Sequence, residues 1–119
     1  MAKDQPQDDG AVRVVFGALA DPARLQVVQL LGEAPRRAGQ LAAAVGVSAP
    51  AMSRHLRVLL EAGIVTDERV AADARMRVFR LRPQSIAVVQ AWLDQLQAHW
   101  DVQLASFQRH VAKKAERTP

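Results

Sequence analysis

The stretch Gln40–Val65, QLAAAVGVSAPAMSRHLRVLLEAGIV, constrains the fold more than any other part of the sequence. Two short helical patterns meet there at Gly46-Val47-Ser48, and so tight a connection forces the two helices to cross at a steep angle. Gly46 suits the left-handed residue that ends a helix, and Ser48 suits the cap that begins the next one. We therefore predict a helix-turn-helix over this stretch.

The second helix of this pair is amphipathic. Its apolar residues recur at helical spacing and predict a buried stripe of Met52, Leu56, Leu59 and Leu60. Successive residues of a helix are separated by about 100°, so Pro50, Arg54 and Arg57 point the opposite way, with Ser53 and His55 on the flanks. An exposed basic face of this kind is typical of a helix that enters the DNA major groove, where arginine can bind guanine through two hydrogen bonds.

The positive charge of the chain lies in the same region. The whole sequence carries a formal charge of +4, whereas residues 36–82 hold nine arginines against four carboxylates, a net charge of +5. Such a segment is either a solvated charged face or a surface for a polyanion. The coincidence of this charge with the helix-turn-helix favours nucleic acid.

The remaining patterns predict one mainly α domain. Helical spacing runs through Ala11–Ala20 and resumes after the helix-start signal Asp21-Pro22. After the helix pair, extended segments at 64–66 and 76–81 flank a turn at 71–75, which predicts a hairpin. A long amphipathic helix follows Pro83. We expect a flexible tail at residues 1–10, a folded domain at 11–112 and a second flexible tail at 113–119.

Basic residues flank the predicted hairpin turn. Arg69 precedes it, and Arg75 and Arg77 follow it. A basic hairpin beside a major-groove helix acts as a wing, whose cations reach phosphates or the adjacent minor groove. The predicted fold class is therefore a winged helix-turn-helix with a two-stranded wing and a long C-terminal helix.

The last helix carries more apolar surface than a core of this size needs, since its stripe continues for about four turns beyond the reach of the small domain. Trp100 and Phe107 lie on that stripe and suit an interface. We predict that this helix forms a homodimer, and packing within one chain is the alternative.

Three segments together resemble the arsenic-repressor-type (ArsR/SmtB) family of small bacterial regulators, namely FGALADPARLQVVQLL, QLAAAVGVSAPAMSRHLRVLLEAGIV and RMRVFRL. The resemblance implies a homodimeric repressor that binds an inverted repeat in promoter DNA and is usually released by an effector. With the helix and wing analysis, it gives the candidate DNA-binding residues Ser48, Ala49, Pro50, Ser53, Arg54, His55, Arg57, Arg69, Arg75 and Arg77. The family's first and last helices form its dimer interface, which implies contacts by Val12, Val15, Phe16, Leu93, Leu96, Trp100, Leu104 and Phe107. Many relatives carry Gln at the position of Ala49.

Metal sensing finds little support in the sequence. The chain has no cysteine, which excludes thiolate sites. His99 and His110 keep the spacing of two zinc ligands in the family's zinc sensors, but Gln97 and Lys113 stand where those sensors carry carboxylates. We therefore predict no metal site and no cofactor, with His99 and His110 as weak candidates only.

Catalytic patterns are missing as well. Ser53 and His55 splay apart by about 200° on a helix and cannot form a nucleophile–base pair, and no Gly-rich phosphate loop is present. We expect a sequence-specific regulator of double-stranded promoter DNA in the bacterial cytoplasm, not an enzyme and not a membrane protein. A winged-helix protein-interaction module, a sequence-independent architectural DNA binder and a zinc-responsive repressor are the alternatives. The effector, either a small apolar molecule at the dimer interface or a protein, stays open.

Overall fold

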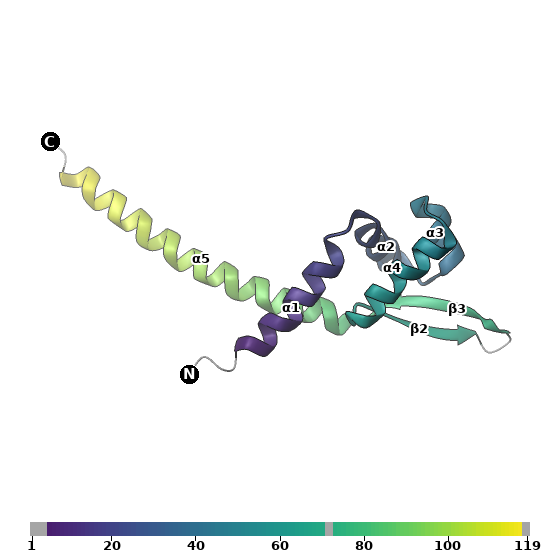
Figure 1. The fold of residues 1–119 in the computed structure, drawn as a ribbon. Coiled ribbons are helices and arrows are strands. Elements are labelled where there is room, and N and C mark those ends of the chain that lie inside the picture. Colours follow the sequence, from purple (N-terminus) through teal and green to yellow (C-terminus); the bar gives the residue numbers. More distant parts are fainter. Residues whose placement is uncertain (1–4, 71–72, 118–119) are drawn as a thin grey trace.

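The computed structural model describes residues 5–70 and 73–117, and the side chains of residues 10–70 and 76–116. Its elements are, in order, α1 (Gln5–Leu19), α2 (Pro22–Glu33), β1 (Arg36–Arg37), α3 (Ala38–Val45), α4 (Ala49–Glu61), β2 (Val65–Val70), β3 (Asp73–Leu81) and α5 (Pro83–Arg117). Figure 1 shows α2, α3 and α4 gathered beside the β2–β3 hairpin, while α1 crosses the first part of α5. The rest of α5 projects away from this body, so the molecule is 77 Å long but only 35 Å and 20 Å in its other dimensions.

The connection between α3 and α4 follows the signals in the sequence. Gly46 ends α3 in the left-handed conformation, with a φ of 82°. Ser48 caps α4, because its side-chain oxygen accepts a hydrogen bond from the backbone N–H of Ala51 at 3.2 Å. This hydrogen bond satisfies a backbone N–H of the first turn, which has no partner inside the helix. The predicted helix-turn-helix connection is thus confirmed.

The sheet contains one strand more than the predicted wing. β2 and β3 form the expected antiparallel hairpin, and its strands are longer than the predicted segments. β1 adds to the other edge of β3, which gives the order β1-β3-β2 and pairs Arg36 with Phe79 and Arg37 with Val78. A two-residue strand shows no alternation of polar and apolar residues, so it leaves no sequence signal. It forms because the fold brings it beside β3.

The core lies between the four shorter helices and the hairpin. Its most buried side chains, none of them accessible to solvent, include Val27, Leu41, Met52, Leu59 and Ile64. The predicted apolar stripe of α4 is buried at Met52, Leu56 and Leu59 and half-buried at Leu60. Complete burial of one such side chain stabilises the folded protein by about 1.5–3 kcal/mol. This packing fixes the rotation of α4 about its axis and leaves the opposite, basic face outward.

The two ends of the chain differ from the prediction. α1 begins at Gln5 and α5 continues to Arg117, so helix extends into both segments that we expected to be tails. The first extension was hidden because residues 5–10 lack apolar periodicity and include Pro6 and Gly10. The second consists largely of Ala, Lys, Glu and Arg, which are strong helix formers without an apolar stripe.

Among the described residues, no single helix is long and apolar enough to cross a membrane. The pair Gly10–Leu19 and Pro22–Glu33, bent by 99°, passes that test by length and composition alone. Both helices contribute side chains to the core, notably Val15 and Val27, and core helices pass the same test.

Candidate nucleic-acid interface

The N-terminal half of α4 presents a continuous exposed face. The predicted residues on this face are all exposed, namely Ser48, Ala49, Pro50, Ser53, Arg54 and Arg57. Neither Arg54 nor Arg57 has a hydrogen-bond or ion-pair partner within the part of the chain that the structure describes. Ser48 uses its oxygen as an acceptor for the helix cap, which leaves its hydroxyl proton able to donate. The face therefore offers several outward hydrogen-bond donors on one rigid element.

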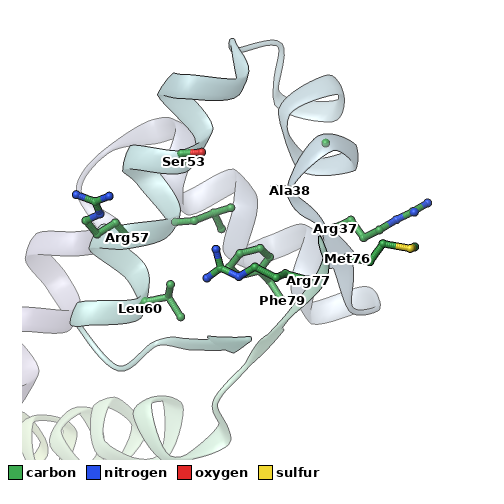
Figure 2. A pocket seen from close by; sticks show the side chains of 10 residues that line it. Arg37, Ala38, Ser53, Arg57, Leu60, Met76, Arg77 and Phe79 are labelled. Atoms are coloured by element: carbon green, nitrogen blue, oxygen red, sulfur yellow. The ribbon is translucent and has the colours of Figure 1, made fainter. Parts of the chain in front are cut away.

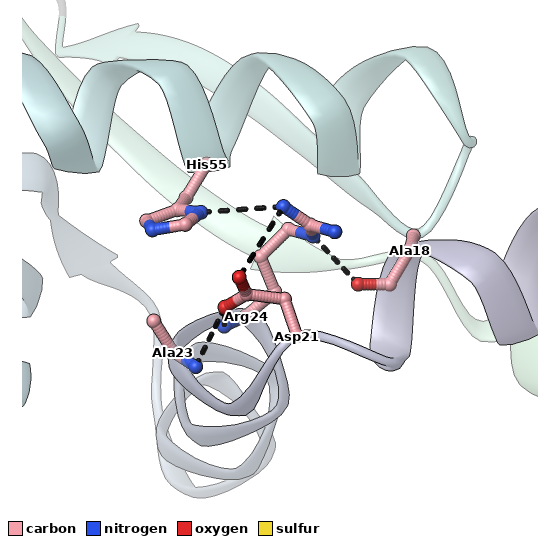
Figure 3. A network of polar contacts seen from close by, with 5 residues as sticks. All are labelled: Ala18, Asp21, Ala23, Arg24 and His55. Atoms are coloured by element: carbon pink, nitrogen blue, oxygen red, sulfur yellow. Dashed lines mark hydrogen bonds and ion pairs between the residues drawn. The ribbon is translucent and has the colours of Figure 1, made fainter.

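His55 lies differently from the other predicted residues of α4. It is half-buried, and its Nδ1 lies 3.4 Å from Nη1 of Arg24 on α2. The Nε of Arg24 donates to the backbone oxygen of Ala18 at 2.6 Å, and Nη1 lies 3.9 Å from the carboxylate of Asp21. Arg24 thereby joins the end of α1, the start of α2 and the flank of α4 (Figure 3). The structure thus gives His55 a contact inside the protein, and its role at DNA stays a prediction.

Asp21 completes this network as the cap of α2. One of its carboxylate oxygens accepts hydrogen bonds from the backbone N–H groups of Ala23 at 2.8 Å and Arg24 at 3.2 Å. The Arg24 N–H is the largest cause that lowers the pKa of Asp21 below its ordinary value of 3.8; partial desolvation opposes it, and the Ala23 N–H, His55 and the Arg24 guanidinium add to the lowering. The carboxylate is therefore ionised at neutral pH, which favours the start of a helix.

On the wing, Arg77 is held by its own hairpin. Its Nε donates to Oδ2 of Asp67 at 2.7 Å, and its guanidinium carbon lies 5.1 Å from the centre of the Phe79 ring. Arg69 is exposed and stands opposite Arg77 in the register of β2 and β3. The side chain of Arg75 lies outside the described residues, so its predicted contact with DNA stays a prediction.

The register of the hairpin explains why the sequence did not reveal two ion-pair partners on the wing, Asp67 and Glu68. Asp67 pairs with Phe79, and this places its carboxylate on the same face as Arg77. Glu68 lies on the other face, where it accepts a hydrogen bond from Nε of Arg80 at 2.7 Å. Neither ion pair follows from sequence spacing, because the pairing depends on a register that only the folded hairpin sets.

The predicted dimer residues divide into two groups. Val12 and Val15 are only 2% and 4% exposed within their own chain, which leaves little of either side chain for a partner, and their contact with one stays a prediction. They lie on the inner side of α1, which packs against α5 and the core. The other predicted residues are exposed despite their size, namely Phe16, Leu93, Leu96, Trp100, Leu104 and Phe107. Phe16 keeps one ring contact, edge to face with Trp92 at 5.6 Å.

The histidines of α5 form no metal cluster in this structure. His99 and His110 are both exposed. Among the described residues, no group of three or more histidines and carboxylates is placed to hold a metal ion.

Comparisons with known proteins agree with this architecture. Residues 21–67, which cover α2, α3, α4 and the start of β2, match the family model described as bacterial regulatory protein, arsR family. The HTH-type transcriptional regulator Rv2034 of Mycobacterium tuberculosis is 35% identical over 101 residues, which are 85% of this chain and 89% of that protein.

Solved structures show the same fold. An ArsR-like transcriptional regulator from Rhodococcus sp. RHA1 has a TM-score of 0.73 at 29% identity, and the match covers 84% of this chain and 92% of that one. The homodimeric winged helix-turn-helix DNA-binding domain Mb0332 of Mycobacterium bovis has a TM-score of 0.62 at 24% identity, covering 87% and 91% of the two chains. The predicted fold class, a mainly helical winged helix-turn-helix with a long C-terminal helix, is confirmed. This chain belongs to the arsR family of bacterial regulatory proteins.

Proposed function

We propose that this protein is a homodimeric transcriptional repressor that binds an inverted-repeat operator in promoter DNA. The observation that carries the proposal is the exposed face of α4, on which Arg54 and Arg57 have no partner among the described residues. An arginine in the major groove can bind O6 and N7 of guanine together, and such a pair contributes about 1–3 kcal/mol of discrimination against the wrong base. The family consists of DNA-binding regulators rather than enzymes, and we place the protein with its DNA in the bacterial cytoplasm.

The exposed stripe on α5 supports the dimeric part of the proposal. Trp100 and Phe107 are 57% and 63% exposed, which is unfavourable for large aromatic side chains unless a partner covers them. The Mycobacterium bovis domain of similar fold is a homodimer. A two-fold axis through α5 would present two copies of α4 to half-sites about 34 Å apart, one turn of DNA.

The function is tested by selection of genomic fragments. The purified full chain is mixed with sheared bacterial DNA at about 0.15 M salt, because the affinity of such proteins depends steeply on ionic strength, and the retained DNA is sequenced. We expect enrichment of one imperfect palindrome. Retention without a shared motif would instead identify an architectural binder, and failure to retain DNA would favour the protein-interaction module.

Base readout by α4 is tested by Arg54→Ala on the selected duplex. We expect a loss of about 1–3 kcal/mol in binding and relaxed preference at one base pair of each half-site. Arg109→Ala, which removes the same charge from α5, is the matched control and leaves the preference unchanged. Equal weakening on all sequences would make Arg54 a phosphate contact. A promoter fusion carrying the palindrome, silenced by the wild-type chain and released by Arg54→Ala, checks the sign of regulation.

A further inference from the structure

A cleft of about 490 Å³ lies between the start of α3, the middle of α4 and β3. The described residues that line it include Arg37, Ser53, Leu56, Arg57, Arg77 and Phe79. Figure 2 shows Arg57 and Arg37 on opposite sides of the cleft, with Arg77 and Phe79 between them. Its size is within the range of sites that hold small organic molecules.

The lining of this cleft has two kinds of surface. Its floor is apolar, since Leu56 and Phe79 are core residues and Leu60 packs beside them. Its charged groups are all cations, because three arginines from three different elements line it and no carboxylate among the described residues does. An apolar floor with guanidinium groups at its edges is complementary to a flat organic molecule that carries a negative charge.

Arg77 is the best placed of the three cations to bind such a molecule. Its Nε and Nη2 both donate to the same oxygen of Asp67, and its guanidinium lies over the Phe79 ring. These contacts leave Nη1 unused by Asp67 and fix the guanidinium plane before any ligand arrives. A pre-organised arginine loses little conformational entropy on binding, and its planar donors match a carboxylate.

The cleft shares residues with the proposed DNA-binding surface. Ser53 and Arg57 belong to the exposed face of α4, and Arg77 belongs to the wing. An anion in the cleft would neutralise cations that otherwise face DNA phosphates, and it would fill space between two elements that approach the duplex. Binding of the anion must then lower the affinity for DNA, and binding of DNA must lower the affinity for the anion, since linkage is reciprocal.

We propose that this cleft binds an amphipathic organic anion of the aryl carboxylate class, and that the bound anion releases the protein from DNA. The second part rests on the proposed function, whereas the first does not. The effector site is thus placed between α4 and the wing, away from α5 and its histidines. No metal ion is needed for such a response.

The binding step is tested without DNA. The full chain is titrated with 2-naphthoate at constant ionic strength, and backbone amide shifts are followed by NMR. We expect saturable shifts confined to the start of α3, α4 and β3, and at least tenfold weaker binding of 2-naphthamide, the neutral isostere. Equal binding of the amide, or shifts centred on α5, would overturn the proposal.

Two wing variants make this test specific. Arg77→Gln removes the guanidinium inside the cleft, and Arg80→Gln removes the guanidinium of the ion pair on the opposite face of β3. Each removes one charge and one ion pair of the same hairpin, so they are matched in their effect on the wing. We expect Arg77→Gln to weaken naphthoate binding at least tenfold and Arg80→Gln to leave it within twofold. A similar loss of naphthoate affinity in both variants would show that only the overall charge of the wing matters, and it would refute the site.

The release step is tested with the selected duplex. Fluorescence anisotropy should show that naphthoate weakens DNA binding by the wild-type chain but not by Arg77→Gln, with sodium chloride added to equal ionic strength as the control. Naphthoate that binds without weakening DNA binding would overturn the release step. If naphthoate does not bind while the duplex still shifts the backbone amide signals of the cleft, the cleft is a binding site for DNA phosphate. That result would refute the small-molecule site. If the genomic selection yields no duplex, the proposed function fails. The naphthoate titration still decides whether the cleft binds an anion, because it uses no DNA.

Discussion

The Asp21 side chain ties the start of α2 to the pH dependence of folding. Its carboxylate caps the helix and lies beside Arg24, which in turn reaches His55 on α4. Hydrogen bonding to the Arg24 N–H is the main reason that its pKa lies below 3.8 in the folded protein. A carboxyl group with a lowered folded pKa stabilises the protein above its unfolded pKa, and this contribution disappears as the pH falls through the folded value.

Asp21→Asn separates the charge of this cap from its hydrogen bonds, because asparagine also caps helices well. We expect the variant to lose less stability than the wild type as the pH falls below about 4, since it has no proton to take up at this position. Urea unfolding across the acid range measures this difference. Glu116→Gln, at an exposed position of α5, is the control and should follow the wild-type curve. Parallel curves for wild type and Asp21→Asn would show that the cap contributes nothing through its charge.

The helix-turn-helix depends on the backbone conformation of Gly46. Its φ of 82° is costly for a residue with a side chain, although a Cβ there would meet no atom within 4 Å. Gly46→Ala should therefore destabilise the fold by about 1–2 kcal/mol through conformation alone. Gly32→Ala, within α2 and with only an ordinary contact of 3.9 Å to Leu81, should instead stabilise by roughly 0.5 kcal/mol. Chemical denaturation of both variants measures the contrast, and a neutral Gly46→Ala would show that the turn can change its conformation.

The elements that could be predicted are those with a local signal. The turn around Gly46 and the apolar stripe of α4 follow from neighbouring residues, so the exposed basic face of α4 was predictable as well. β1, the Arg77–Asp67 pair and the Arg24–His55 contact were not, because each joins residues brought together only by the folded chain. The cleft beneath α4 belongs to the same class, since its three arginines come from three separate elements.

The molecule consists of a small packed body and a long part of α5 that projects from it. From Leu93 to Glu116, every described residue except the half-buried Ala105 is exposed, and the large apolar ones other than Val102 form a stripe along one side. Within the part of the chain that the structure describes, no other element covers this stripe (Figure 1). A second copy related by a two-fold axis would cover the stripe on both helices at once.

Trp100→Ala tests whether this stripe is the dimer interface. A two-fold axis places each substitution in the interface twice, and a buried tryptophan at an interface commonly contributes at least about 2 kcal/mol. We therefore expect sedimentation velocity to show a shift from dimer to monomer at micromolar concentration. Helix content by circular dichroism should stay high, because Trp100 is 57% exposed in the single chain.

Val102→Ala is the matched control, since Val102 is 65% exposed but lies about 200° around the helix from Trp100. Dissociation by Val102→Ala with a stable dimer in Trp100→Ala would place the interface on the opposite side of α5. A monomer that no longer spans both half-sites should also bind the full palindrome only as weakly as a single half-site, which connects the exposed stripe of α5 to operator recognition by α4.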